Sequence, residues 1–150
     1  RGTEASAATV WRGAATWGAA GASITAATAT VATGETTNNT SYTALTTPGP
    51  AVTVTIGASG LALVIVTCAA INTGTDLSHM GYAISGATTA IAADATAYRI
   101  LTGSSGFTSR GSAAQLVTGL TAGSTTFTAQ YRVVAGSSTF SDRNITVVVL

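Results

Sequence analysis

Strict alternation of apolar and small polar residues is the feature that most constrains how this chain can fold. In AVTVTIG, from Ala51, valine or isoleucine stands at every second position with threonine between, and TFTAQYRVV repeats the pattern from Thr126. Successive side chains of a strand point to opposite faces, so a period of two indicates half-buried β-strands. Glycine-containing turns such as GASG (57–60) and GLTAG (119–123) separate the segments. About eight to ten short strands divided in this way predict an all-β fold, an antiparallel β-sandwich or jelly roll.

Two segments are apolar on both faces. LALVIVTCAAI (61–71) has almost no polar residue, and ITVVVL (145–150) places Val147 on one face and Val148 and Leu150 on the other. An antiparallel sheet usually has one wet face, so such strands need cover on both sides. A second sheet supplies one cover. A long loop, the N-terminal segment or another subunit supplies the other.

The composition argues against several classes of function. Charged residues make up 7% of the chain and the net charge is +1, whereas about a quarter of residues are charged in an average protein. This balance gives no electrostatic basis for binding nucleic acid or an anionic membrane. The apolar run at 61–71 is shorter than the roughly 20 residues of a membrane-spanning helix. A weakly charged surface of Thr, Ser, Ala and Gly suits a component of a particle.

Few residues are able to carry out catalysis. His79 is the only histidine and Cys68 the only cysteine, which lies in an apolar run and is expected as a buried thiol. Asp76 and Asp94 can approach His79, but no glycine-framed serine marks a nucleophile beside them. We therefore expect no enzyme, no metal site and no cofactor, and a binding or structural role instead.

The chain is expected to divide near residue 38. Residues 1–37 are predicted as an N-terminal attachment segment and linker, and residues 38–150 as the sandwich domain. Within the first part, the Thr/Ala-rich residues 21–37 form either an edge strand or a linker. The chain opens on Arg1 rather than Met, so we expect a processed or partly represented product.

The N-terminal segment TEASAATVWR predicts a short helix. Thr3 is its expected N-cap and Gly13 its expected end. Trp11 and Trp17 are the only tryptophans. They are expected to pack either on the domain itself or on a neighbouring chain, where they would act as attachment residues.

The C-terminal segment LVTGLTAGSTTFTAQYRVVAGSSTFSDRNITVVVL carries a resemblance to a known family. The residues that match its pattern are Leu120, Gly123, Phe127, Tyr131, Arg132, Thr139, Phe140, Arg143, Ile145, Thr146 and Val147. In these the chain resembles bacteriophage virion proteins, common in phages of actinobacteria, with a tumour-necrosis-factor-like or complement-type jelly roll. The resemblance covers about residues 40–150. The start, RGTEASAATVWRGA, looks like the segment that precedes such domains, but departs from it at Ala5 and Ser6.

The resemblance implies a homotrimer on the surface of a phage particle. The chain would serve as a tail or head fibre, a tail-tip protein or a capsid decoration, bound to other virion proteins through its N-terminal segment. Ending on an apolar strand, it would be the outermost module. Apolar residues in excess of what one thin sandwich hides are the expected trimer interface. These are Tyr82, Phe127, Tyr131, Val148 and Leu150.

Contact with a host surface glycan would fall on loops, which commonly carry binding residues. The expected loops are Thr75–Met80, Ala92–Thr96 and Ser104–Arg110. The candidate contact residues are Asp76, His79, Tyr98 and Arg110, with Tyr42 as a further residue able to stack on a sugar. Ordinary exposed loops are the alternative interpretation of each segment.

A second resemblance gives a different function. GLTAGSTTFTAQYRV is similar to the Gly-Leu-x-x-Gly-x-x-Tyr strand of fibronectin type III domains. It implies a secreted bacterial carbohydrate-binding or adhesin module. Those domains usually carry a core tryptophan on an early strand, whereas both tryptophans here lie in the first 17 residues.

Overall fold

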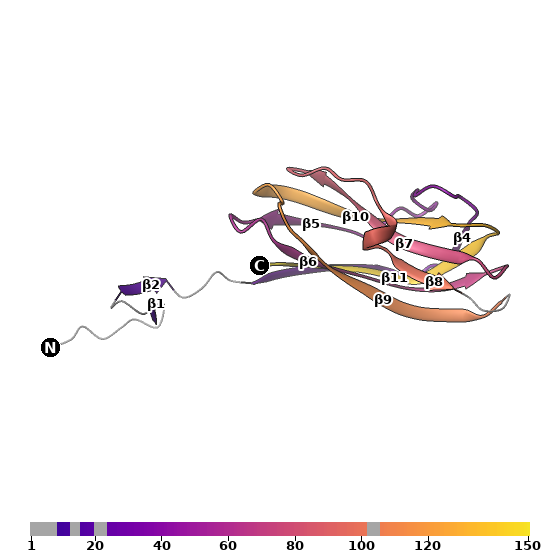
Figure 1. Ribbon diagram of the computed structural model, residues 1–150, viewed down its shortest axis with the longest axis horizontal. Coiled ribbons are helices and arrows are strands. Elements are labelled where there is room, and N and C mark those ends of the chain that lie inside the picture. Colours follow the sequence, from indigo (N-terminus) through magenta and orange to yellow (C-terminus); the bar gives the residue numbers. More distant parts are fainter. Residues whose placement is uncertain (1–8, 13–15, 20–23, 102–105) are drawn as a thin grey trace.

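The computed structural model is a sandwich of two antiparallel β-sheets (Figure 1). It describes residues 9–12, 16–19, 24–101 and 106–150, and the side chains of the last two ranges. The four-stranded sheet has the order β5 (Ala51–Ile56), β10 (Gly123–Val133), β7 (Leu77–Gly86) and β8 (Tyr98–Leu101). The five-stranded sheet has the order β3 (Thr25–Val31), β11 (Ser138–Val149), β6 (Ala62–Asn72) and β9 (Thr108–Val117), with β4 (Glu35–Thr37) also paired to β11. The expected all-β antiparallel sandwich is confirmed.

The strands pair in a nested order along the chain. β3 pairs with β11, β5 with β10, β6 with β9 and β7 with β8, and every pair is antiparallel. Leaving aside the short β4, the first strand of the sandwich lies beside the last and the second beside the second-last. Successive pairs alternate between the two sheets.

Every second residue of the long strands builds the core. In β10, Phe127, Ala129 and Tyr131 are buried, while the residues between them are partly exposed. The ring centroid of Tyr131 lies 5.0 Å from that of Phe140 on β11, so the two sheets are joined by aromatic packing. Each large apolar side chain buried in this way contributes about 1.5–3 kcal/mol to folding. The alternation predicted for β5 and β10 is confirmed.

Strand β6 shows how the sandwich treats a strand that is apolar on both faces. Val64, Val66 and Cys68 face the core and are buried, whereas Leu63 and Ile65 point outward and are half-buried. The core therefore covers one face of β6 completely. The other face remains partly in contact with solvent.

A β-bulge interrupts β11 between Ser141 and Asn144. Asp142 has φ 48°, in the left-handed region that side-chain-bearing residues seldom adopt. The extra residue shifts the inward positions from Phe140 to Arg143, which is fully buried. A charged side chain thereby enters one end of the core.

The Arg143 guanidinium has partners there. It donates to the carbonyl oxygen of Thr33 at 3.1 Å and of Thr47 at 3.4 Å, and Nη2 lies 3.7 Å from Glu35 Oε1. Its Cζ is 5.4 Å from the Tyr131 ring centroid. Both oxygens of the Glu35 carboxylate accept from the backbone N–H of Thr47, and hydrogen bonding by the side chain and then the backbone of Thr47 lowers the pKa of Glu35. Arg143 thus fastens the segments before β4 and before β5 to the core.

Residues 25–37 belong to the five-stranded sheet. β3 pairs with β11 over Arg143–Val149, and β4 pairs with it over Ser138–Phe140. Of the two alternatives predicted for this segment, the structure has the edge strand. The expected boundary at residue 38 would separate β3 and β4 from the strand that they pair with, so the sandwich begins before it.

The N-terminal helix expected from TEASAATVWR is wrong for residues 9–12. Thr9–Arg12 form strand β1, which pairs with β2 (Thr16–Ala19) and places Trp11 opposite Trp17 in the register. Three of the four residues of β1 are β-branched or aromatic, and these favour strands. The expected cap at Thr3 and end at Gly13 lie outside the described residues.

Candidate functional site

The outer face of the four-stranded sheet is partly covered by Tyr42. Residues 39–43 run beside β10, where Thr43 and Tyr131 exchange backbone hydrogen bonds of 3.1 and 2.9 Å. From there the Tyr42 ring crosses β10 and rests on Gly81 of β7. A Cβ atom at position 81 would lie 3.0 Å from Tyr42 Cε1, so the absence of a side chain makes room for the ring.

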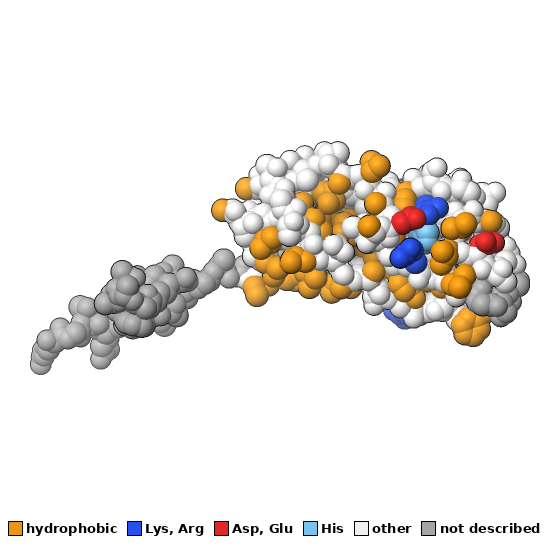
Figure 2. Space-filling model, viewed as in Figure 1, with side chains coloured by type: hydrophobic (Ala, Val, Ile, Leu, Met, Phe, Trp, Pro, Cys, Tyr) orange, Lys and Arg blue, Asp and Glu red, His pale blue; other side chains and the backbone are white. Residues whose placement is uncertain are grey.

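Four side chains meet at this cover, and we call them the Asp94 cluster: Tyr42, His79, Asp94 and Arg132. Asp94 lies in the 3₁₀ turn η1 (Asp94–Thr96), and its Oδ1 accepts hydrogen bonds from Tyr42 Oη at 3.0 Å and Arg132 Nε at 2.9 Å. Arg132 Nη2 donates to Asp94 Oδ2. His79 Nδ1 lies 3.4 Å from Asp94 Oδ1. Figure 2 shows an acidic side chain set between basic ones on this part of the surface.

The charges of the Asp94 cluster follow from these contacts. Hydrogen bonds from Arg132, and secondarily from Tyr42, lower the pKa of Asp94 to about 2. Burial lowers the pKa of His79, and the positive charges of Arg132 and Arg99 lower it further, while Asp94 opposes them. At neutral pH the cluster is therefore an ion pair beside a neutral imidazole.

The Asp94 cluster borders a hollow of about 570 Å³, whose lining combines the polar Thr40, Ser41 and Gln130 with the apolar Ile91, Ala92 and Ala93. Its charged groups are already paired with one another, so they hold the cover in place. His79 is 1% exposed, and neither ring nitrogen has a hydrogen-bond partner among the described residues. A histidine enclosed in this way does not touch a molecule in the hollow directly.

Other reactive groups are equally enclosed. Burial raises the pKa of the Cys68 thiol to about 12, so it stays protonated and is a weak nucleophile. In residues 24–101 and 106–150, no group of three or more His, Cys, Asp or Glu side chains could hold a metal ion. The described part of the chain has no helix of the length and apolarity needed to cross a membrane.

One row across the outer face of the five-stranded sheet is apolar and exposed in part. In the register, Val148 stands between Ala26 and Leu63, and Leu63 stands opposite Leu116. Leu63 and Val148 are half-buried and Leu116 is 50% exposed. We call this row the apolar face: Ala26, Val148, Leu63 and Leu116. Figure 2 shows hydrophobic side chains gathered near the end of the body where the C-terminus lies.

The five expected trimer-interface residues fall into two groups. Tyr82, Phe127 and Tyr131 are at most 3% exposed because they face the core between the sheets. They leave no surface for another chain, so their assignment to an interface is corrected. Val148 belongs to the apolar face, and Leu150 is 43% exposed beyond its end.

The expected host-contact residues are spread over the molecule. Asp76 lies in the turn before β7 and is half-exposed, outside the Asp94 cluster, whereas His79 is buried on β7. Tyr98 is half-buried on β8 with its hydroxyl against the backbone of Gly111. Arg110 is exposed, but it lies on strand β9. Because β7 begins at Leu77 and β9 at Thr108, two of the expected loops are partly strands.

The Asp94 cluster could not be assembled from the sequence alone. Asp94 is 52 residues from Tyr42 and 38 from Arg132. The alternation does predict that Arg132 points outward. The one further signal is Gly81, a glycine within an otherwise regular strand, which indicates a close approach by another group.

No family of known proteins matches the sequence, and no curated protein matches it. The function is therefore argued from the fold and the surfaces.

Proposed function

We propose that the protein is a structural component of a bacteriophage particle, a homotrimer of jelly-roll domains exposed on the particle surface as a fibre, tail-tip or decoration protein. The nested strand order supports the jelly roll. Pairing of first with last, second with second-last and so on, split between two sheets, is what a rolled-up antiparallel ribbon produces. The resemblance of residues 40–150 to virion jelly rolls motivates the assignment to a phage.

The observation that carries the trimer is the apolar face. Monomeric proteins seldom leave a contiguous apolar row uncovered, and such rows commonly mark contacts between chains. The row runs the whole width of the sheet, from Ala26 on β3 to Leu116 on β9. If the β3 side of one chain meets the β9 side of the next, the contact joins two different patches. Contacts of that kind form rings such as trimers when the rotation from one chain to the next closes.

Attachment to other virion proteins is assigned to the N-terminal hairpin, in which Trp11 and Trp17 stand opposite each other in the register. Contact with a host surface glycan is assigned to the expected residues outside the core, Asp76 and Arg110. Replacing Arg110 with Ala should weaken binding to host cells. Unchanged binding would remove that residue from the proposal.

The alternative of a fibronectin-like adhesin module has less support. Immunoglobulin-type sandwiches have about seven strands, with the first strand in a sheet of the order ABED. Here the first strand, β3, pairs with the last, β11. An adhesin of that class would also be expected as a monomer.

Sedimentation equilibrium on the purified protein tests the trimer. The wild type is expected at three times the mass of the chain, and Val148→Asp or Leu150→Asp should sediment as a folded monomer, because a carboxylate would be buried without a partner. Thr128→Asp is the matched control, on the outer face of the other sheet. A wild-type monomer at micromolar concentration would overturn the trimer.

Immunogold electron microscopy tests the assignment to a particle. An antibody raised against the protein should label phage particles purified from the strain that encodes it. Labelling of the bacterial surface without labelling of particles would favour the adhesin instead.

A further inference from the structure

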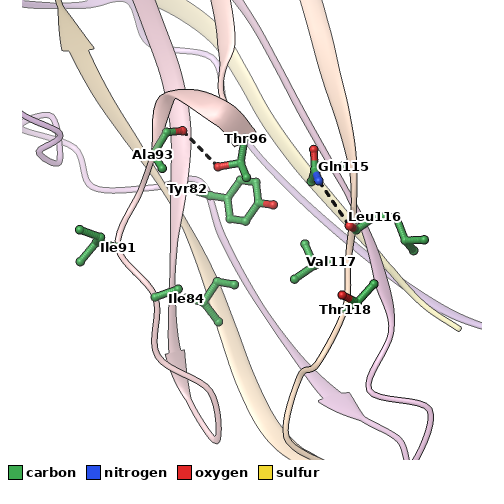
Figure 3. Close-up of a pocket in the computed structure, with 10 residues that line it drawn as sticks. Tyr82, Ile84, Ile91, Ala93, Thr96, Gln115, Leu116, Val117 and Thr118 are labelled. Atoms are coloured by element: carbon green, nitrogen blue, oxygen red, sulfur yellow. Dashed lines mark hydrogen bonds between the residues drawn. The ribbon is translucent and has the colours of Figure 1, made fainter.

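A pocket opens at the edge of the sandwich where the two sheets part (Figure 3). β8 pairs only with the first part of β7, Leu77–Met80. Beyond it, the connection that contains Ala90–Thr96 runs along β7, and β9 faces it from the other sheet. The space between them has a volume of about 290 Å³. This pocket adjoins the hollow at the Asp94 cluster, with which it shares Ile91 and Ala93 as lining residues.

The floor of the pocket holds a buried hydroxyl without a partner. Tyr82 is 3% exposed, and its hydroxyl forms no hydrogen bond with any described residue. Burial raises the pKa of Tyr82 to about 12, and the nearby Thr96 side chain opposes this shift, while the Thr96 hydroxyl itself donates to Ala93 O at 3.1 Å. Figure 3 shows the Tyr82 hydroxyl pointing across the pocket toward β9. A buried hydroxyl left unpaired is costly, so it favours a ligand that can pair with it.

The opposite wall offers a second polar group. In β9, Gln115 shares its side of the strand with Ala113 and Val117, which pack against the core, and its own exposed side chain lies at the rim of the pocket. Gln115 Nε2 donates only to the carbonyl oxygen of the adjacent Leu116, at 3.4 Å. That distance is at the weak end for a hydrogen bond, and the amide remains available.

The rest of the lining is apolar or neutral. Ile84, Ile91 and Val117 supply apolar surface, and none of the lining residues is charged. A pocket of this kind rejects ions, because burying an unpaired charge is expensive. Its size is near the lower end for small-molecule sites, which combine apolar walls with a few placed polar groups.

We propose that this pocket binds a small uncharged molecule with an apolar body and one hydroxyl or carbonyl group. The apolar body lies against Ile84 and Val117, and the polar group pairs with the Tyr82 hydroxyl. The proposal goes beyond the structural role and does not depend on it.

Three compounds with the same ring test the chemistry. In ¹H–¹⁵N NMR titrations, cyclohexanol is expected to shift the side-chain amide of Gln115 and the backbone amides of Thr96 and Thr118 in a saturable way. Cyclohexanecarboxylate and cyclohexylammonium are expected to leave them unchanged. Equal binding of either ion, or no saturable shift with cyclohexanol, would overturn the proposal.

A pair of matched variants tests the role of the hydroxyl. Tyr82→Phe keeps the ring in the core and removes one hydrogen bond, so it should weaken cyclohexanol binding roughly five- to tenfold. Tyr42→Phe removes a hydroxyl of the same kind at the Asp94 cluster and should leave binding unchanged. Equal affinity of Tyr82→Phe and the wild type would exclude the hydroxyl as a ligand group.

Cyclohexanol binding by proteins of different oligomeric state distinguishes a failure of the small-molecule site from a failure of the trimer. Cyclohexanol should bind equally to the wild type and to Val148→Asp, whatever the mass of each. Binding to a monomeric Val148→Asp alone would show that a neighbouring chain fills the pocket in the trimer. That result would overturn the small-molecule site while leaving the trimer intact.

Discussion

The two sheets of this sandwich treat their outer faces in opposite ways. The four-stranded sheet is covered by the chain's own Tyr42, which the Asp94 cluster holds down over Gly81. On the five-stranded sheet, none of the described residues forms such a cover over the half-buried Val148 and Leu63. On the four-stranded sheet, the hydrogen bonds of the Asp94 cluster hold one of the chain's own side chains over the outer face. Among the described residues the apolar face has no comparable cover, which is why the proposed contact between chains is placed there.

Removing the cover should have the largest effect. Tyr42→Ala loses the ring on Gly81, the hydrogen bond to Asp94 and the cation–π contact with Arg132, whose Cζ lies 5.6 Å from the ring centroid. We expect the free energy of unfolding to fall by about 2–4 kcal/mol in urea denaturation. Tyr42→Phe, which keeps the ring, should lose about 1 kcal/mol. Equal losses for the two variants would mean that the ring does not cover the sheet.

Removing the negative charge of Asp94, which holds Tyr42 in place, should lower the free energy of unfolding by less than Tyr42→Ala does. Asp94→Asn keeps one acceptor oxygen but loses the ion pair with Arg132, and the site is partly exposed, so we expect a loss of about 1 kcal/mol at pH 7. The pKa of Asp94 falls from 3.8 to about 2 on folding. The stability it contributes is therefore present above pH 3.8 and is lost as the pH falls toward 2. In Asp94→Asn, the free energy of unfolding should no longer show this decrease as the pH falls toward 2. The same decrease in the variant and the wild type would exclude Asp94 as its cause.

His79 should make the covered face sensitive to mild acid. Its pKa is lowered from 6.5 on folding, so the unfolded state takes up a proton that the folded state resists. The free energy of unfolding should then fall as the pH drops below 6.5. His79→Phe has no proton to gain and should lose this dependence, with little cost at pH 8 because neither ring nitrogen has a partner. Parallel pH profiles of variant and wild type would exclude His79 as the cause.

The smallest effect is expected on the apolar face. Thr146 lies on the same side of β11 as Val148, with its hydroxyl 3.0 Å from that of Thr28. Thr146→Val extends the apolar surface and should strengthen association of the chains about two- to threefold in sedimentation. Thr128→Val on the other sheet should not change it. Weaker association of Thr146→Val would place the contact elsewhere.

The sequence predicted the inward face of the strands better than it predicted what lies against them. The alternation around Phe127 and Tyr131 correctly separates inward from outward residues, because it depends only on neighbours along one strand. It does not say whether the inward layer meets a second sheet or another chain. The sequence therefore predicts an interface role for aromatic residues that instead fill the core. The cover over His79 depends on contacts dozens of residues apart, which no local pattern contains.

The bulge at Asp142 divides the last strand into two parts that differ in which alternate residues point inward. Before it, Ser138 and Phe140 point inward at even positions; after it, Ile145 and Val147 point inward at odd ones. The number of residues in the junction, rather than their chemistry, therefore sets which side of the sheet each later residue occupies. Deleting Asp142 would remove this offset, so that either the first part of the strand or the last would have to turn over. The division between core valines and surface valines at the C-terminus is held by one extra residue.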